Sequence, residues 1–169
     1  IILLTNREMT ELPLKTEAFV VEGPGEYEIG DVSVQGVAAQ LHTDEGGLKG
    51  TMYRIGVGDI SILVTGHIMP KVSENQVEAI GTVDIIVVPV GGKGLTLDGV
   101  GAVEVIQNFE PKIVIPTHFD DKKTTYPMPQ DTLETFTKEI GLEPEKMERF
   151  KVKSQDLPET MRVIELARV

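Results

Sequence analysis

The stretch VDIIVVPVGGKGLTLDGVGAVEVIQNFEPKIVIPTH, residues 83–118, has the pattern of a strand, a glycine-rich loop, a helix and a second strand. Both predicted strands, at residues 84–90 and 112–115, are apolar at consecutive positions, which is typical of strands covered on both faces. Between them, Asp98 can cap a helix. This order predicts a right-handed parallel crossover. His118 then lies at the end of the second strand, where α/β proteins commonly place their functional groups.

Three glycines follow the first of these strands, at positions 91, 92 and 94. They allow a tight turn or a close approach of the backbone to a ligand. They lack the spacing of a phosphate-binding loop that leads directly into a helix. The sequence therefore favours a turn here over a phosphate site.

The composition predicts a single domain over residues 1–169, because a chain of this length with 40% hydrophobic residues can bury one core. A formal net charge of −11 disfavours nucleic acid and anionic lipid as partners. No apolar run is long enough for a membrane span. The absence of cysteine excludes disulfides and thiolate metal sites, and it is in keeping with a cytoplasmic location.

The rest of the sequence predicts mainly strands before this unit and a helix after it, which is typical of a sheet core with helices outside. The capping box of Ser73 and Gln76 predicts a short helix that Gly81 ends. A later helix is predicted to have Pro129 in its first turn and to end before Gly141. Strands are predicted at residues 1–5, 18–21, 27–29, 32–37, 52–57, 60–64, 150–152 and 161–166, with residues 27–37 and 52–64 forming antiparallel hairpins.

The sequence has three histidines, and each falls at the end of a predicted strand or just beyond it: His42, His67 and His118. Strand-end imidazoles from separate segments are the arrangement that a metal site needs, because rigid strands fix the direction of each ligand. The other interpretation is three unrelated surface or hydrogen-bonded histidines. The spacing alone favours this second interpretation, because no pair has metal-ligand spacing in the sequence.

The chain resembles the metallo-β-lactamase superfamily, and within it the small bacterial branch similar to Zn-dependent hydrolases. The resemblance extends over nearly the whole chain. Its matching segments are Gly23-Pro24-Gly25-Glu26-Tyr27-Glu28, Gly36-Val37 followed by His42, Lys49-Gly50-Thr51-Met52-Tyr53, residues 83–92, residues 111–119, and Leu157-Pro158-Glu159-Thr160.

This resemblance implies an α/β fold of the metallo-β-lactamase type, an αβ/βα sandwich of two mixed β-sheets with helices on the outer faces. The family's metals lie at one end of the sheets. Two strands of the family would precede Ile1, so the resemblance implies that the N-terminal strands are absent and the first sheet is incomplete. An incomplete sheet leaves an open edge. We therefore expect a homo-oligomer, or a partner that covers this edge.

The resemblance also places the site residues, and it implies that the metal-binding motif is degenerate. His42 corresponds to the histidine of the third motif and His118 to that of the last motif. The family's metal-bridging Asp falls at His67. The main motif, Ser/Thr-His-x-His-x-Asp-His, falls at residues 5–11, where Asn6, Glu8, Thr10 and Glu11 stand at its histidine and aspartate positions.

Two functions follow from this ligand set. The first is a diverged and non-catalytic structural or interaction module, with a vestigial site and no cofactor. The alternative is a hydrolase of esters, lactones or phosphoesters with a reduced mononuclear site, in which Glu11, His67 and His118 hold one zinc, iron or manganese ion. Two histidines and one carboxylate are a recognised ligand set for these metals. In the family's geometry, Glu8 and His42 would contribute more weakly to the other metal position.

Overall fold

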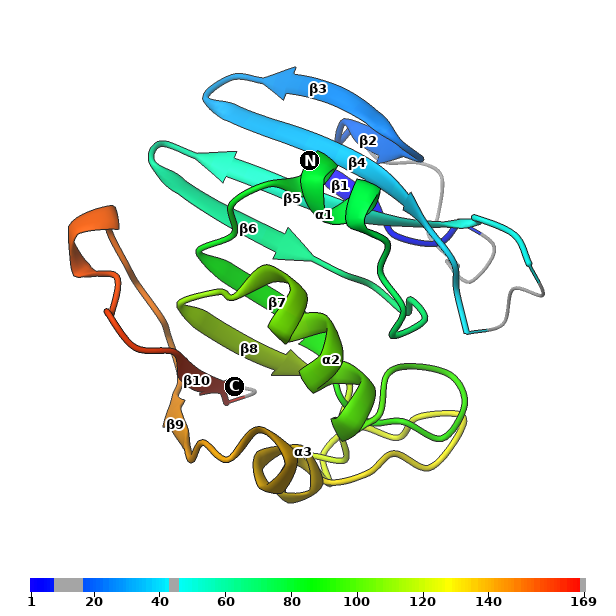
Figure 1. Cartoon of the computed structure of the whole chain (residues 1–169), viewed down its shortest axis with the longest axis vertical. Helices are drawn as coiled ribbons and strands as arrows, with labels where there is room; N and C mark the ends of the chain where they lie inside the picture. The colour runs from blue at the N-terminus through cyan, green and yellow to red at the C-terminus, as the bar shows by residue number, and fades with distance from the viewer. Residues whose placement is uncertain (8–16, 43–45, 168–169) are drawn as a thin grey trace.

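The computed structural model describes residues 1–7, 17–42 and 46–167. Its main element is an eight-stranded mixed sheet, and a two-stranded parallel sheet lies behind one end of it (Figure 1). The small sheet consists of β1 (Ile2–Leu4) and β2 (Val20–Glu22). In spatial order the large sheet contains β3 (Gly25–Ile29), β4 (Val32–Ala39), β5 (Gly50–Val57), β6 (Ile60–Val64), β7 (Ile85–Pro89), β8 (Ile113–Thr117), β10 (Arg162–Leu166) and β9 (Pro144–Met147).

The direction of the strands changes halfway across the large sheet. From β3 to β6 the neighbouring strands are antiparallel, as the two predicted hairpins require. From β6 through β7, β8 and β10 to β9 they are parallel. The predicted crossover from β7 to β8 is confirmed, and α2 (Gly99–Phe109) connects the two strands. The carboxyl ends of β6 and β8 therefore meet at one edge of the sheet.

The helices cover the face of the sheet that is turned toward the viewer in Figure 1. They are α1 (Glu74–Ile80), α2 and α3 (Leu133–Ile140). Ser73 and Gln76 form the predicted capping box of α1, and Asp98 Oδ1 accepts a hydrogen bond of 2.8 Å from Gly101 N to cap α2. The main core lies between these helices and the sheet. Among its fully buried members are Met52, Leu63, Ile86, Val88, Val105, Ile106, Val114 and Phe136.

The opposite face of the sheet has two smaller clusters of buried side chains. The first joins the small sheet to the large one through Val21, Val34 and Tyr53. The second contains Ile85, Ile113 and Ile164, and residues 150–157 pack against it. Side chains alternate between the two faces of a strand. Ile86 and Val88 therefore face the helices, whereas Ile85 faces the other side.

Two of the predicted elements are wrong. Pro129 does not lie in the first turn of α3, which begins at Leu133 after the N-cap Thr132. Residues 150–152 do not form a strand, and the strand of this region is β9 instead. Phe150 and Val152 are apolar because they pack against the second cluster, without pairing with a neighbouring strand.

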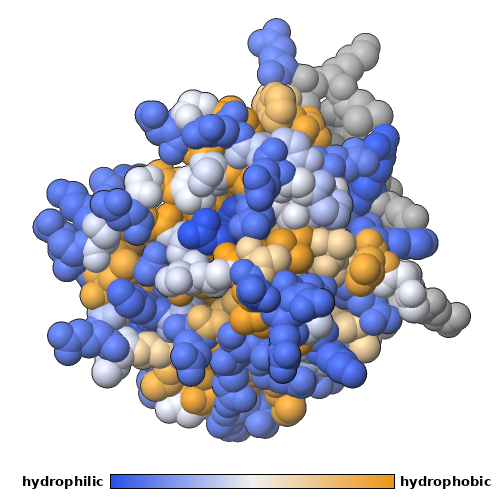
Figure 2. Space-filling view, turned by 45° about the horizontal axis from the view of Figure 1, so that its top comes forward, coloured by the Kyte–Doolittle hydropathy of each residue, from blue (hydrophilic) through white to orange (hydrophobic). Residues whose placement is uncertain are grey.

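The face shown in Figure 2 is largely hydrophilic, with hydrophobic residues between the hydrophilic ones. This distribution is normal for a folded domain. Of the helices that the structure describes, none has the length and apolarity to cross a membrane.

Candidate functional site

The ends of three strands bring the histidines together. His118 directly follows β8, and His67 comes three residues after β6. His42 follows β4, where its backbone N–H donates a hydrogen bond of 3.3 Å to the carbonyl oxygen of His67. The backbones of the His42 and His67 segments are therefore joined next to the site.

The side chains of His67 and His118 are in direct contact. Their ring centroids are 4.5 Å apart, and the rings meet edge to face at 87°. Tyr126 lies against His118 with a centroid distance of 4.6 Å and an angle of 36°. The three rings form a contiguous cluster at the sheet edge, and the edge-to-face contact of the two histidines is a geometry that aromatic rings favour.

Two of the histidines have ring nitrogens in defined surroundings. Nδ1 of His67 lies 3.3 Å from the carbonyl oxygen of Leu95. A carbonyl oxygen can only accept, so this Nδ1 carries the proton and Nε2 keeps its lone pair. Nε2 of His42 is buried and has no hydrogen-bond partner among the described residues. A buried imidazole nitrogen without a partner is uncommon and marks a candidate site for a ligand.

Burial lowers the pKa of all three histidines below the ordinary value of 6.5. The neighbouring His118 and, to a smaller degree, His42 lower the pKa of His67 further, while its hydrogen bond to Leu95 acts in the opposite direction. Asp98 partly offsets the effect of burial at His42. The three imidazoles are therefore neutral at pH 7, which is the state in which imidazole binds metals.

The backbone around His118 is unusual. Its φ angle is 55°, in the left-handed region that non-glycine residues seldom adopt. Its carbonyl oxygen lies so close to Gly91 that a Cβ atom at position 91 would be 2.0 Å away. Gly91 is therefore needed because the two loops that leave β7 and β8 touch there.

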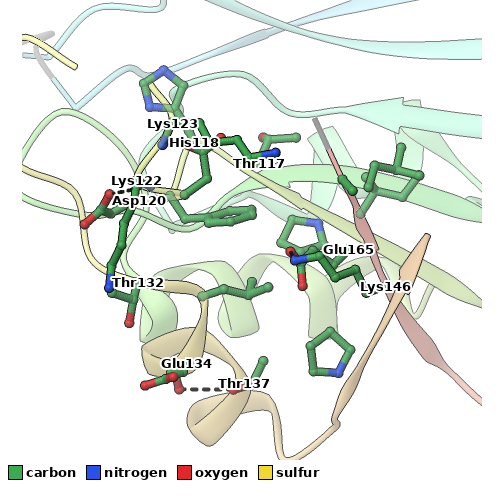
Figure 3. A pocket seen from close by; sticks show the side chains of 18 of the residues that line it. Thr117, His118, Asp120, Lys122, Lys123, Thr132, Glu134, Thr137, Lys146 and Glu165 are labelled. Carbon is green, nitrogen blue, oxygen red and sulfur yellow. Dashed lines mark hydrogen bonds and ion pairs between the residues drawn. The ribbon is translucent and has the colours of Figure 1, made fainter. Parts of the chain in front are cut away.

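A cavity of about 520 Å³ opens beside His118. It lies between the carboxyl end of β8, the loop after it, the start of α3 and the end strands β9 and β10 (Figure 3). Its lining contains three lysines and a larger number of acidic residues, namely Asp120, Asp121, Glu134, Glu143 and Glu165. The volume is sufficient for a small molecule.

The structure brings together part of the predicted ligand set. His67 and His118 are neighbours, but Glu8 and Glu11 lie outside the described residues, so the set of Glu11, His67 and His118 stays a prediction. Within residues 1–7, 17–42 and 46–167, no group of three or more His, Cys, Asp or Glu side chains is placed to hold a metal ion. A metal would therefore need a ligand from elsewhere in addition to this histidine pair.

The described chain before residue 8 passes close to the loop that carries His67. Thr5 is the residue after β1, and its carbonyl oxygen accepts a hydrogen bond of 2.9 Å from Thr51 N. A Cβ atom at Gly66 would lie 2.7 Å from Cβ of Thr5. Thr5 therefore lies next to Gly66, the residue before His67.

The sequence did not indicate two groups of this site. They are the carbonyl oxygen of Leu95, which orients His67, and the side chain of Gln130, whose Oε1 lies 3.5 Å from Nδ1 of His118. A backbone carbonyl has no sequence signal, and a single glutamine in a loop belongs to no motif.

Comparisons with known proteins agree with this architecture. A family described as the beta-lactamase superfamily domain matches residues 1–118. Among solved structures, a protein from Thermotoga maritima that is assigned as a Zn-dependent hydrolase of the metallo-β-lactamase superfamily has a TM-score of 0.65 and 24% identity over 88% of this chain. A protein from Parabacteroides distasonis assigned as a metal-dependent hydrolase has a TM-score of 0.55 and 17% identity over 88% of the chain. A metallo hydrolase from the archaeon Ignicoccus hospitalis has a TM-score of 0.54 and 16% identity over 89% of the chain.

The chain matches only part of each of these solved structures. The chain spans 71% of the Thermotoga protein and 58% of each of the other two. No curated protein matches in a sequence search. At these identities, the solved structures establish the fold and leave the activity open. The family match covers most of the chain and the fold agrees with it, so this chain belongs to the metallo-β-lactamase superfamily.

Proposed function

We propose that this chain is a diverged metallo-β-lactamase-fold protein that has lost two-metal hydrolysis and serves as a structural or interaction module. The resemblance places His67 where the family has its metal-bridging Asp. A carboxylate has two oxygens that can bridge two cations, whereas neutral imidazole offers one lone pair. The ring of His67 packs against His118 instead. The cysteine-free composition is in keeping with a cytoplasmic location.

The proposed interaction role rests on an apolar groove. It has a volume of about 840 Å³ and lies on the face of the sheet opposite the helices. Ile60, Ile62, Ile85, Val87 and Ile115 form its floor, and residues 150–154 and 156 form part of its wall. Parallel strands such as β7 and β8 are normally covered on both faces. We therefore expect another polypeptide surface, in the simplest case a second copy of this chain, to cover this groove.

Charged substitutions at the rim of the groove test this expectation. Val57 and Leu166 line the groove and are 48% and 42% exposed, so lysine at either position should leave the fold intact. We expect the wild-type chain to self-associate in analytical ultracentrifugation, and Val57→Lys or Leu166→Lys to shift it toward the monomer. Val100→Lys is the matched control, because Val100 is exposed on α2 and does not line the groove. A wild-type chain that stays monomeric at high concentration would contradict self-association through this face.

A mononuclear hydrolase is the second candidate, and the histidine pair favours it. His67 and His118 are adjacent, and burial lowers the pKa of both, so they are neutral. With Glu11 they would form a two-histidine, one-carboxylate set for zinc, iron or manganese, and the unpartnered Nε2 of His42 fits a weaker contribution together with Glu8. A bound metal would supply a Lewis acid that activates water. The cavity beside His118 would hold an ester, lactone or phosphoester substrate.

Hydrolysis assays with added zinc, iron(II) or manganese test this second candidate. The hydrolase proposal expects turnover of at least one ester, lactone or phosphodiester, which falls to the uncatalysed rate in both His118→Ala and Glu11→Gln. Glu104→Gln is the control, because Glu104 is exposed on α2, lines neither cavity and is no proposed ligand. Absence of turnover with all three metals, or equal turnover in His118→Ala, would contradict the hydrolase.

A further inference from the structure

We infer that Gln130 is a positioning residue, which fixes the tautomer of His118 so that Nε2 of the imidazole keeps its lone pair. Oε1 of Gln130 lies 3.5 Å from Nδ1 of His118. This inference concerns the free protein, so it holds whether or not a metal binds, and it does not rest on the proposed function.

The first step is the orientation of the Gln130 amide. Its Nε2 donates to two backbone carbonyl oxygens, those of Met128 and Pro129, each at 3.2 Å. Both carbonyls can only accept a hydrogen bond. If the amide were rotated by half a turn, its oxygen would face these two oxygens and both hydrogen bonds would be lost. The loop therefore determines that Oε1 of Gln130 is the atom that faces His118.

The second step is the space that holds the Gln130 side chain. A Cβ atom at Gly91 would lie 2.2 Å from Oε1 of Gln130 and 3.1 Å from its Cβ, so Gln130 lies directly against the Gly91 backbone. The next residue is also fixed there, because Asp131 N donates a hydrogen bond of 2.8 Å to Gly91 O. Asp131 O in turn accepts one of 3.0 Å from Asp120 N, two residues after His118. Gln130 is thus held between the two loops that frame His118.

The third step is the consequence for the imidazole. Oε1 of Gln130 can only accept, so the neutral ring of His118 carries its proton on Nδ1 and its lone pair on Nε2. The carbonyl of Leu95 imposes the same tautomer on His67. Oxygen acceptors at Nδ1 are the usual means by which proteins orient a histidine whose Nε2 binds a ligand. The two adjacent rings at the sheet edge therefore both have their lone pair on Nε2.

NMR of the ¹⁵N-labelled histidine rings tests this inference, at a pH well above the ordinary histidine pKa so that the rings are neutral. In the wild type, Nδ1 of His118 should be pyrrole-like and Nε2 pyridine-like. Gln130→Met keeps a similar size but removes the acceptor, so His118 should become a mixture of both tautomers. His67 is the internal control and should not change in this variant.

Two results would overturn the inference. One is a wild-type His118 with its lone pair on Nδ1. The other is a Gln130→Met variant that is folded, as judged by its backbone amide spectrum, and keeps the wild-type tautomer at His118. A metal ion at Nε2 would leave the proton of His118 on Nδ1, so failure of this inference is distinguishable from failure of either proposed function.

Discussion

Replacement of Gly91 by alanine is expected to lower the free energy of unfolding by about 3 kcal/mol, because the new methyl group has no space. Its Cβ would lie 2.0 Å from the carbonyl oxygen of His118 and 2.2 Å from Oε1 of Gln130. Neither neighbour moves away easily. Val90 N donates a hydrogen bond of 3.0 Å to Thr117 O on one side of this contact, and Asp131 N donates one of 2.8 Å to Gly91 O on the other.

Urea unfolding followed by circular dichroism measures this effect. The control is Val100→Ala on the exposed side of α2, which should change the free energy of unfolding by no more than about 0.5 kcal/mol. A Gly91→Ala protein as stable as this control would show that the loops after β7 and β8 are not in the tight contact described above.

Replacement of Tyr53 by alanine is expected to cost about 4 kcal/mol, because it removes a large side chain from a fully buried position. Tyr53 is 0% exposed and packs with Val21 and Val34 between the small sheet and the large sheet. Its hydroxyl lies 3.1 Å from Leu4 O, 3.4 Å from Val21 O and 3.3 Å from Gly23 O. The side chain therefore connects β5 to the end of β1, to β2 and to the turn that follows β2.

Tyr53→Phe separates the two contributions of this residue. It keeps the packing and removes only the hydroxyl, so we expect a loss of about 1 kcal/mol in the same unfolding experiment. The Tyr53→Ala protein should also show faster amide hydrogen exchange in β1 and β2 than the wild type. Equal stability of Tyr53→Ala and the wild type would contradict the assignment of Tyr53 as the link between the two sheets.

The sequence predicted most of the fold because its strongest signals are local. The strand, helix and strand of residues 83–118 combine consecutive β-branched residues with an Asp cap, and the capping box of α1 is a local motif as well. The prediction of where α3 begins failed because contacts with other loops determine its start. Gln130 and Asp131 bond to loop carbonyls and to Gly91, and these contacts hold the residues after Pro129 in a loop until α3 begins.

The unpredicted strand β9 and the wrongly predicted strand at residues 150–152 have a common cause. Strand β9 lies at the edge of the sheet, and its sequence PEKM has no alternating apolar pattern. Residues 150–152 have the apolar pattern of a strand, but Phe150 and Val152 only pack across the sheet face. The periodicity of apolar residues indicates which side chains are buried, but it does not indicate which segments pair with a neighbouring strand.

The candidate site was predictable only in part. The spacing of the three histidines left their proximity open, and the family resemblance was needed to place His67 and His118 at one end of the sheets. The contact of their rings agrees with that placement. The orientation of each ring depends on Leu95 O and Gln130 Oε1, which no sequence pattern specifies.

The content of transition metals in the purified protein tests the central claim, the loss of the two-metal site, most directly. The protein should be prepared without chelator and measured by elemental mass spectrometry beside its His67→Ala and His118→Ala variants. We predict at most one zinc, iron or manganese ion per chain, and any such ion should be lost in both variants. Two metal ions per wild-type chain would contradict the account.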